Sequence, residues 1–140
     1  MCIKNNFDFE KEVKKHYGKC KKVYEKKLSA IYNCNNDKKV GKSTEETSIK
    51  GVYALYLDGQ LMKIGRAITG SGIFTRMSQY YRLSNEGSKY ITEKNRDLIE
   101  VKYFELTDNK ECWAGEKRLQ VIAFDCGEKM PWDDEVEKDH

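Results

Sequence analysis

Hydrophobic residues and lysines alternate through the first part of the chain at a helical spacing. Apolar residues recur every three or four positions across residues 7–17 and again across residues 19–33, as in a half-buried α-helix. Gly18 separates the two stretches, and residues 34–48 are polar throughout. The pattern predicts two basic helices followed by a linker.

From residue 49 the pattern becomes that of β-strands. Residues 49–57 and 60–65 are rich in aromatic and aliphatic residues, and Asp58-Gly59 stands between them. An Asp-Gly pair between two such runs is a strong hairpin signal. We therefore expect two antiparallel strands joined by a tight turn.

The length of the hairpin loop decides which side chains share a face of the sheet. A two-residue turn would place Tyr53 opposite Ile64 and would leave Lys63 on the other face. A three-residue loop with Gly59 in the left-handed conformation would place Tyr53 opposite Lys63, with Leu55 and Leu61 beside them. We expect the three-residue loop.

A helix is predicted to follow Gly70-Ser71-Gly72 and to run to about Leu83, with Ser71 as its N-cap. Arg76 and Tyr80 lie four residues apart, so they are neighbours on the helix surface. The helical periodicity assigns its buried face to Ile73, Phe74, Met77 and Tyr81.

The remaining pattern predicts one more strand and one more helix. Residues 84–97 form a polar insert, and residues 98–106 alternate as a third strand. Asp108 and Glu111, three residues apart, form a capping box for a helix that ends at Phe124. The expected fold is α+β, with a three-stranded antiparallel sheet flanked by helices and preceded by a helical segment.

Composition and boundaries refine this picture only slightly. Of the 140 residues, 39% are hydrophobic and 35% are charged, and no window approaches the roughly 18 apolar residues that a membrane span needs. The five cysteines form no CxxC pair, and the first residues are not those of a secretory signal, so we expect a cytoplasmic protein with reduced thiols. The pattern divides the chain into a basic segment (1–48), a central domain (49–126) and an acidic tail (127–140) expected to be solvated.

Charge is distributed unevenly along the chain. Residues 11–27 hold eight Lys and two Glu, a net +6, whereas residues 125–140 hold seven acids and two Lys, a net −5. The basic stretch is either a solvated helix face or a surface for a polyanion. It could also dock a partner subunit or a second copy of the chain. The candidate nucleic-acid contacts are Lys14, Lys15, Lys21, Lys22, Arg66 and Arg82.

Glu116 is an unusual residue for its position. On a helical projection it points into an apolar face, where a carboxylate is costly to desolvate unless a cation meets it. One explanation is an ion pair with Lys63, Arg66 or Arg76, and the other is a divalent metal ion. The apolar face consists of Cys112, Trp113, Leu119, Ile122 and Ala123.

The chain carries, in this order, Gly51-Val52-Tyr53, Lys63-Ile64-Gly65, Arg66, Arg76, Tyr80 and Glu116. This combination resembles the motifs of the GIY-YIG nuclease superfamily. The resemblance covers residues 50 to about 124, and the ordered combination is far more specific than either tripeptide alone. Lys63 stands where the second motif usually has Tyr, and the Asn that often follows the family's glutamate has no candidate here.

The resemblance implies a role for each matched residue. Tyr53 would lie against the scissile phosphate as general base, and a neighbouring Lys63 ammonium would favour its phenolate. Arg76 would stabilise the phosphorane, with Arg66 and Tyr80 completing the catalytic set. Glu116 would hold Mg²⁺ or Mn²⁺, which binds few protein ligands and keeps several waters.

The expected function is therefore a metal-dependent endonuclease that hydrolyses phosphodiester bonds in DNA. The sequence does not distinguish DNA from RNA, and no membrane partner is expected. The alternative is a nucleic-acid-binding or regulatory module that keeps the fold without cutting. The missing Asn and the small size of the chain motivate that alternative.

Overall fold

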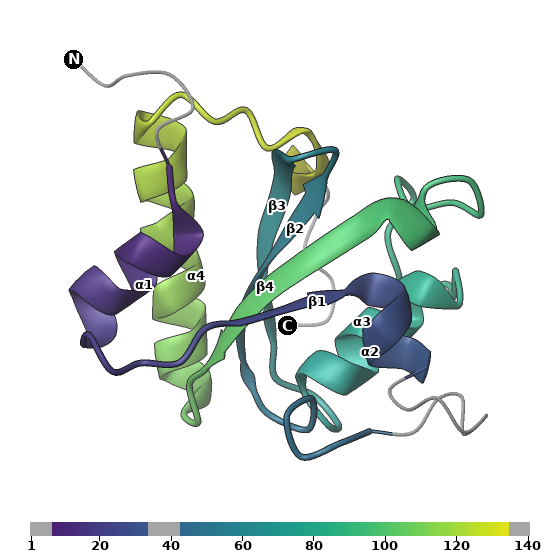
Figure 1. Cartoon of the computed structure of the whole chain (residues 1–140), viewed down its shortest axis with the longest axis horizontal. Helices are drawn as coiled ribbons and strands as arrows, with labels where there is room; N and C mark the ends of the chain where they lie inside the picture. Colours follow the sequence, from purple (N-terminus) through teal and green to yellow (C-terminus); the bar gives the residue numbers. More distant parts are fainter. Residues whose placement is uncertain (1–6, 34–42, 135–140) are drawn as a thin grey trace.

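The computed structural model describes residues 7–33 and 43–134, which form an antiparallel sheet with helices on both of its faces (Figure 1). The predicted α+β class is confirmed, but the described sheet has four strands, in the order β1-β4-β2-β3, instead of three. The strands are β1 (Tyr24–Lys27), β2 (Gly51–Leu57), β3 (Gln60–Ala67) and β4 (Ile99–Glu105). The helices are α1 (Phe9–Tyr17), α2 (Leu28–Asn33), α3 (Ile73–Tyr81) and α4 (Asn109–Asp125), with short 3₁₀ turns η1 (Arg96–Leu98) and η2 (Pro131–Asp134).

Strand β1 corrects the expectation of one helix across residues 19–33. This part of the chain pairs with β4 at the sheet edge, and the helix that follows is short. Tyr24 stacks on Tyr103 with ring centroids 4.9 Å apart, and Lys26 lies 2.7 Å from Glu46 in an ion pair. Lysines are common on edge strands because they discourage pairing with another chain. The apolar spacing that indicated one helix comes from two different elements.

The helices form two layers around the sheet (Figure 1). Helices α1 and α4 cover one face, and α2 and α3 cover the other. Phe9 and Val13 of α1 are fully buried against the sheet, so the described part of the basic segment shares the core of the central domain. Any partner that docks on α1 would therefore meet its polar side.

The β2–β3 hairpin closes with a two-residue turn, so the predicted three-residue loop is wrong. Leu57 pairs with Gln60, and the turn residues Asp58 and Gly59 have φ angles of 54° and 77°. Two consecutive left-handed residues are the signature of a type I′ turn, whose twist matches that of the flanking strands.

A β-bulge at Met62 then shifts the register of β3. Tyr53 lies opposite Gly65 instead of opposite Lys63. Because side chains alternate between faces, Tyr53 and Lys63 still share a face, as expected, although they are not paired. Leu61, expected beside them, packs in the core on the other face.

The start of α3 differs from the prediction. Gly72, not Ser71, is the N-cap, and it has a φ of 63°. The first N–H of the helix donates to the carbonyl of Ile49 at 2.8 Å, and the N–H of Phe74 donates to the carbonyl of Thr47 at 2.9 Å. A Cβ on residue 72 would lie 2.1 Å from the Ile49 oxygen, which explains the glycine. The segment before β2 thus caps this helix.

The second half of the chain follows the predicted order of insert, strand and helix. Residues 84–95 contain neither helix nor strand, and β4 lies inside the expected range 98–106. Asp108 is the N-cap of α4 and accepts a hydrogen bond of 2.7 Å from the N–H of Lys110. Trp113 was expected on the buried face but is 53% exposed.

The described part of the acidic tail is only partly solvated, which corrects the expectation for residues 127–140. Met130 and Trp132 are buried, and the turn η2 packs against β3. The last residues, 135–140, lie outside the described part, as do residues 34–42 of the predicted linker. No helix in the described ranges is long and apolar enough to cross a membrane.

Candidate functional site

Two tyrosine hydroxyls meet between β2 and α3. The oxygens of Tyr53 and Tyr80 are 2.5 Å apart, and their rings are nearly perpendicular. Each residue is 1% exposed. Burial raises the pKa of Tyr80 well above its usual range, with Tyr53 adding to the rise and Arg76 and Lys63 opposing it. Tyr80 therefore stays protonated and can donate to the Tyr53 oxygen.

Gly65 provides the space in which the Tyr53 ring lies. The two residues are paired across the hairpin, and a Cβ on residue 65 would lie 2.5 Å from the Tyr53 hydroxyl oxygen and 2.6 Å from its Cζ. Any larger residue would meet the ring itself. The glycine that ends the Lys63-Ile64-Gly65 tripeptide is thus required by the tyrosine of the first tripeptide.

Arg76 borders the tyrosine pair. Its guanidinium lies 4.8 Å from the centre of the Tyr80 ring, which confirms that the two residues are helix neighbours. It also donates to the Gln79 side chain at 3.0 Å and to the backbone carbonyl of Glu86 at 2.7 Å. The buried face of α3 is rotated from the predicted one, since Tyr80 is buried and Tyr81 is only half-buried.

Lys63 shares the tyrosine face of the sheet and forms an ion pair that the sequence did not indicate. It is 3% exposed, and its Nζ lies 3.5 Å from Oδ1 of Asp133 in η2. Burial raises the pKa of Asp133 to about 6, while Lys63 and a hydrogen bond from the backbone of Ile64 act to lower it. Above that pH the carboxylate is charged and pairs with the ammonium.

Glu116 forms a buried ion pair on the opposite face of the sheet. Its partner is Arg66, one of the three cations expected as alternatives to a metal. Glu116 is fully buried, and Arg66 is 7% exposed. Gln120, one turn further along α4, lies 3.5 Å from the second carboxylate oxygen and donates to the backbone carbonyl of Ile64 at 2.9 Å.

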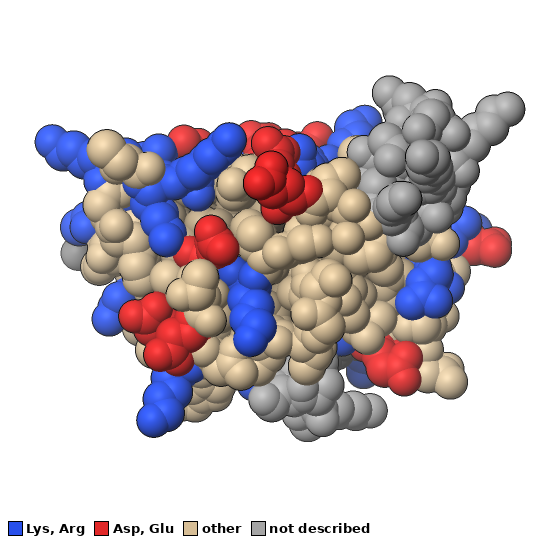
Figure 2. Space-filling model, turned by 90° about the horizontal axis from the view of Figure 1, so that it is seen from below, with Lys and Arg blue, Asp and Glu red and all other residues tan. Residues whose placement is uncertain are grey.

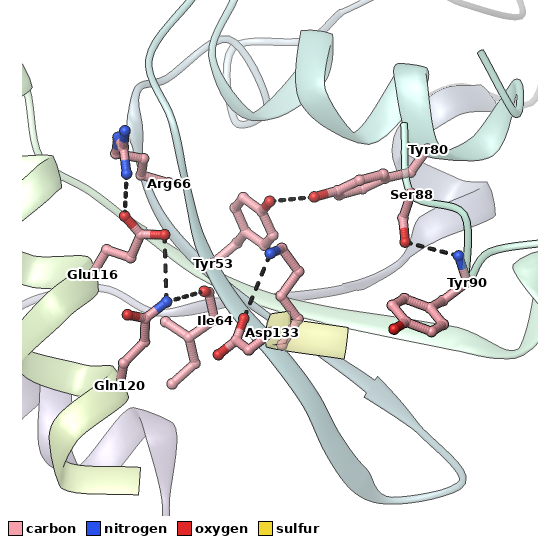
Figure 3. Close-up of polar contacts among 10 residues, drawn as sticks. Tyr53, Ile64, Arg66, Tyr80, Ser88, Tyr90, Glu116, Gln120 and Asp133 are labelled. Atoms are coloured by element: carbon pink, nitrogen blue, oxygen red, sulfur yellow. Dashed lines mark hydrogen bonds and ion pairs between the residues drawn. The ribbon is translucent and has the colours of Figure 1, made fainter. Parts of the chain in front are cut away.

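The expected residues therefore fall into two groups separated by β3 (Figure 3). Tyr53, Tyr80, Lys63 and Arg76 lie on the α3 face, whereas Arg66 and Glu116 lie on the α4 face. Ile64 of β3 links the two groups, because its backbone N–H donates to Asp133 and its carbonyl accepts from Gln120 beside Glu116. The edge strand β3 carries Lys63 and Arg66, and its Gly65 pairs with Tyr53, so this strand joins the two groups.

A resident divalent metal ion does not fit the residues around Glu116 in this arrangement. The guanidinium of Arg66 already lies on the carboxylate, and a second cation there would be repelled. Full burial also leaves no room for the waters that Mg²⁺ retains. Within the described ranges, no three His, Cys, Asp or Glu residues gather as metal ligands.

The lysines expected to contact nucleic acid differ in their exposure and in the contacts that their ammonium groups make within the protein. Lys15 is exposed, but the ammonium of Lys14 donates to the backbone carbonyl of Lys21 at 3.1 Å and lies 3.8 Å from a carboxylate oxygen of Glu10. Lys22 is exposed and borders the Tyr24 ring. On the face shown in Figure 2, basic and acidic side chains are interspersed.

The two candidate arginines are placed very differently. Arg82 follows α3 and is exposed, so it is available to a phosphate backbone. Arg66 is buried in its pair with Glu116, so it does not form part of the surface. Of the two, Arg82 is placed for a surface contact.

Sequence reasoning missed Asp133, Gln120 and the aromatic contact between Tyr90 and Trp132. The Tyr90 and Trp132 rings are nearly parallel, with centroids 6.1 Å apart, and they join the polar insert to the C-terminal turn. The available signal was the apolar triplet Met130-Pro131-Trp132 inside an acidic tail. Such a triplet is atypical of a solvated segment.

No family model, curated protein or solved structure matches the chain. The function is therefore inferred from the motif residues and from their placement on this fold.

Proposed function

We propose that this protein is an endonuclease of the GIY-YIG type that hydrolyses phosphodiester bonds in DNA. The observation that carries the proposal is the contact between the Tyr53 and Tyr80 hydroxyls, with Arg76 and Lys63 both close enough to lower the pKa of Tyr80. Two phenol oxygens beside two cations suit an anionic ester and a proton that must be removed from water. The described arrangement is a resting state, because both hydroxyls are buried.

Tyr53 is the general base in this proposal. A free phenol is a weak base at neutral pH, and two features would favour the Tyr53 phenolate. Tyr80 keeps its proton and would donate a hydrogen bond to that oxygen. The Lys63 ammonium on the same face would add Coulombic stabilisation.

Arg76 would bind the phosphate and stabilise the phosphorane. Its planar guanidinium can donate two parallel hydrogen bonds to phosphate oxygens as charge builds up. Its contacts with the Tyr80 ring and the Glu86 carbonyl hold it beside the base. Arg82, exposed one residue beyond α3, and the lysines of residues 14–22 would add backbone contacts to DNA.

No step is assigned to a metal ion, because Arg66 occupies the carboxylate of Glu116 in this arrangement. The expected dependence on Mg²⁺ or Mn²⁺ is therefore a separate question from the roles of the tyrosines. Its test is whether nicking requires the metal and whether the apolar double variant Arg66→Met/Glu116→Leu loses metal-dependent nicking while it remains folded.

A second candidate function is a module that binds nucleic acid without cutting it. The observation in its favour is the Arg66–Glu116 pair, which turns the residue expected to hold a metal into a structural ion pair. In that case the motif residues would serve the fold, and Gly65 would be retained for the Tyr53 ring alone.

Plasmid nicking separates the two functions. Purified wild-type protein, Tyr53→Phe and Tyr56→Phe would be compared with Mg²⁺, Mn²⁺ and EDTA. Tyr56 is the matched control, since it lies on the same strand but packs with the core on the other face. We expect nicking by wild type and Tyr56→Phe and a loss of about 100-fold or more in Tyr53→Phe, the scale of a missing general base. Full activity in Tyr53→Phe would overturn its assignment as base, and binding without nicking in wild type would favour the module.

A further inference from the structure

The C-terminal turn covers the tyrosine face of the sheet. Trp132 is buried and belongs to the same core cluster as Tyr53 and Tyr80, whereas Met130, just before the turn, packs in the cluster on the α4 face. The Trp132 ring stacks on Tyr90 of the polar insert with an interplanar angle of 3°. The turn and the insert thus contact each other, and Trp132 contributes to the core in which the two tyrosines are buried.

Asp133 occupies the position that an anion would take on the edge of β3. One carboxylate oxygen lies 3.5 Å from Nζ of Lys63, and the backbone N–H of Ile64 donates to the same carboxylate. Figure 3 shows the Asp133 carboxylate beside β3, between the Tyr53 ring and the Glu116–Gln120 pair. A lysine ammonium with a neighbouring backbone N–H is a donor set that suits a phosphate oxygen equally well.

We propose that Lys63 and the Ile64 N–H form an anion site for a backbone phosphate of the substrate. Residues 131–133 act as an internal cover, and the Asp133 carboxylate occupies this site in the resting protein. The inference rests on the proposed function for the identity of the ligand. DNA binds when a phosphate displaces Asp133 and the Trp132–Tyr90 stack opens. The apparent affinity for DNA is then the affinity of the open protein multiplied by the fraction of molecules that are open.

The affinity test uses the full chain with single substitutions and a short, nuclease-resistant phosphorothioate DNA duplex. Asp133→Ala removes the whole carboxylate, so that nothing competes for the anion site, and Asp125→Ala is the matched control, because it makes the same change on an exposed residue at the end of α4. If the cover is open in about one molecule in ten, Asp133→Ala binds the duplex about tenfold more tightly. The control changes affinity by about twofold or less, the effect of one distant exposed charge.

The position of the cover is read from Trp132 itself. The chain has two tryptophans, so Trp113→Phe leaves Trp132 as the single fluorophore. Acrylamide should quench Trp132 weakly in the resting protein, because this residue is 5% exposed, and strongly once the duplex is bound. Trp132→Leu, with Asp133 intact, should also tighten duplex binding, and it serves as the second variant if Asp133→Ala fails to fold.

Two results would overturn the cover while leaving the proposed function standing. The first is an equal duplex affinity of Asp133→Ala and Asp125→Ala. The second is a Trp132 that stays protected from acrylamide in the DNA complex. Failure of every variant to bind or nick DNA would instead overturn the proposed function. In that case the anion site is tested by adding inorganic phosphate to the protein. Increased quenching of Trp132 by acrylamide supports the site, and unchanged quenching rejects it.

Discussion

Tyr53 lies directly over Gly65, its partner across the hairpin, with the hydroxyl oxygen only 2.5 Å from the point where a Cβ on residue 65 would stand. This contact places the tyrosine ring flat along the neighbouring strand and aims its oxygen at Tyr80. The two short motifs of the sequence are therefore one packing unit.

Gly65→Ala should destabilise the protein through this contact. The added methyl group overlaps the Tyr53 ring, and overpacking of this kind costs about 1–3 kcal/mol. Tyr53→Leu removes the ring, so the double variant Gly65→Ala/Tyr53→Leu should lose less stability than the two single variants together. Urea unfolding of the four proteins measures this coupling, and strictly additive losses would argue against the contact.

Glu116→Gln should be strongly destabilising. It leaves the Arg66 guanidinium buried without its carboxylate, and breaking a buried ion pair on one side costs about 3–5 kcal/mol. Replacing both partners by apolar residues, as in Arg66→Met/Glu116→Leu, should restore much of the loss. The matched control is Glu111→Gln, an exposed carboxylate in the first turn of α4, which should cost about 0.3–1 kcal/mol.

The same variants separate structure from catalysis at Glu116. If the apolar double variant folds and still nicks plasmid, Glu116 acts in stability alone. If it folds and is inactive while Tyr56→Phe is active, the carboxylate has a role that the ion pair does not explain.

Asp133 should give stability a pH dependence below neutrality. Burial raises the pKa of this carboxyl to about 6 in the folded protein, against an ordinary 3.8, so the folded state binds the proton more tightly than the unfolded chain. The contribution of Asp133 to stability is then largest below the ordinary pKa, and it falls by up to about 3 kcal/mol as pH rises through the folded pKa.

The measurement is the difference in free energy of unfolding between wild type and Asp133→Asn, followed from about pH 4 to about pH 7. The free energy of unfolding of wild type should fall relative to that of Asp133→Asn as pH rises, because the Asn side chain does not titrate. A constant difference across this window would show that Asp133 titrates normally.

Replacing Lys14, Lys15, Lys21 and Lys22 with Gln should flatten the salt dependence of DNA binding. Each lost phosphate contact lowers the slope of log affinity against log salt by about 0.9. Among the single variants, Lys14→Gln should have the least effect, because its ammonium is held by the Lys21 carbonyl and by Glu10. The slope is measured by titration of a labelled duplex at several salt concentrations.

The control for the salt dependence is a second variant in which four exposed lysines outside the N-terminal segment are replaced with Gln. An equal change of slope in both variants would mean that net charge, not the N-terminal surface, determines binding. The four control positions are Lys94, Lys110, Lys117 and Lys129.

Local sequence determined the elements whose signals lie within a few residues. Asp58-Gly59 set the hairpin, because two left-handed residues in a row suit few other pairs. Asp108 set the start of α4 through its own hydrogen bond to the Lys110 N–H. The buried position of Glu116 was also predictable, because the helical period places it among apolar residues.

Tertiary structure decided what depends on distant partners. Residues 24–27 became a strand because the edge of β4 was available to pair with them, which no local propensity shows. Lys63 reached the face of Tyr53 through a bulge at Met62 rather than through the turn. Of three possible cations, Arg66 reached Glu116, since alternation along β3 points it towards α4.

The site itself shows the same division. The sequence determined which residue types lie on β2, β3 and α3, because motif spacing and strand alternation are local. Only the folded chain brought Asp133 into contact with Lys63, 70 positions earlier in the sequence, and placed Trp132 in the same core cluster as the two tyrosines. Contacts across such a distance depend on which surfaces the whole core leaves available, and that is a property of packing and not of any short pattern.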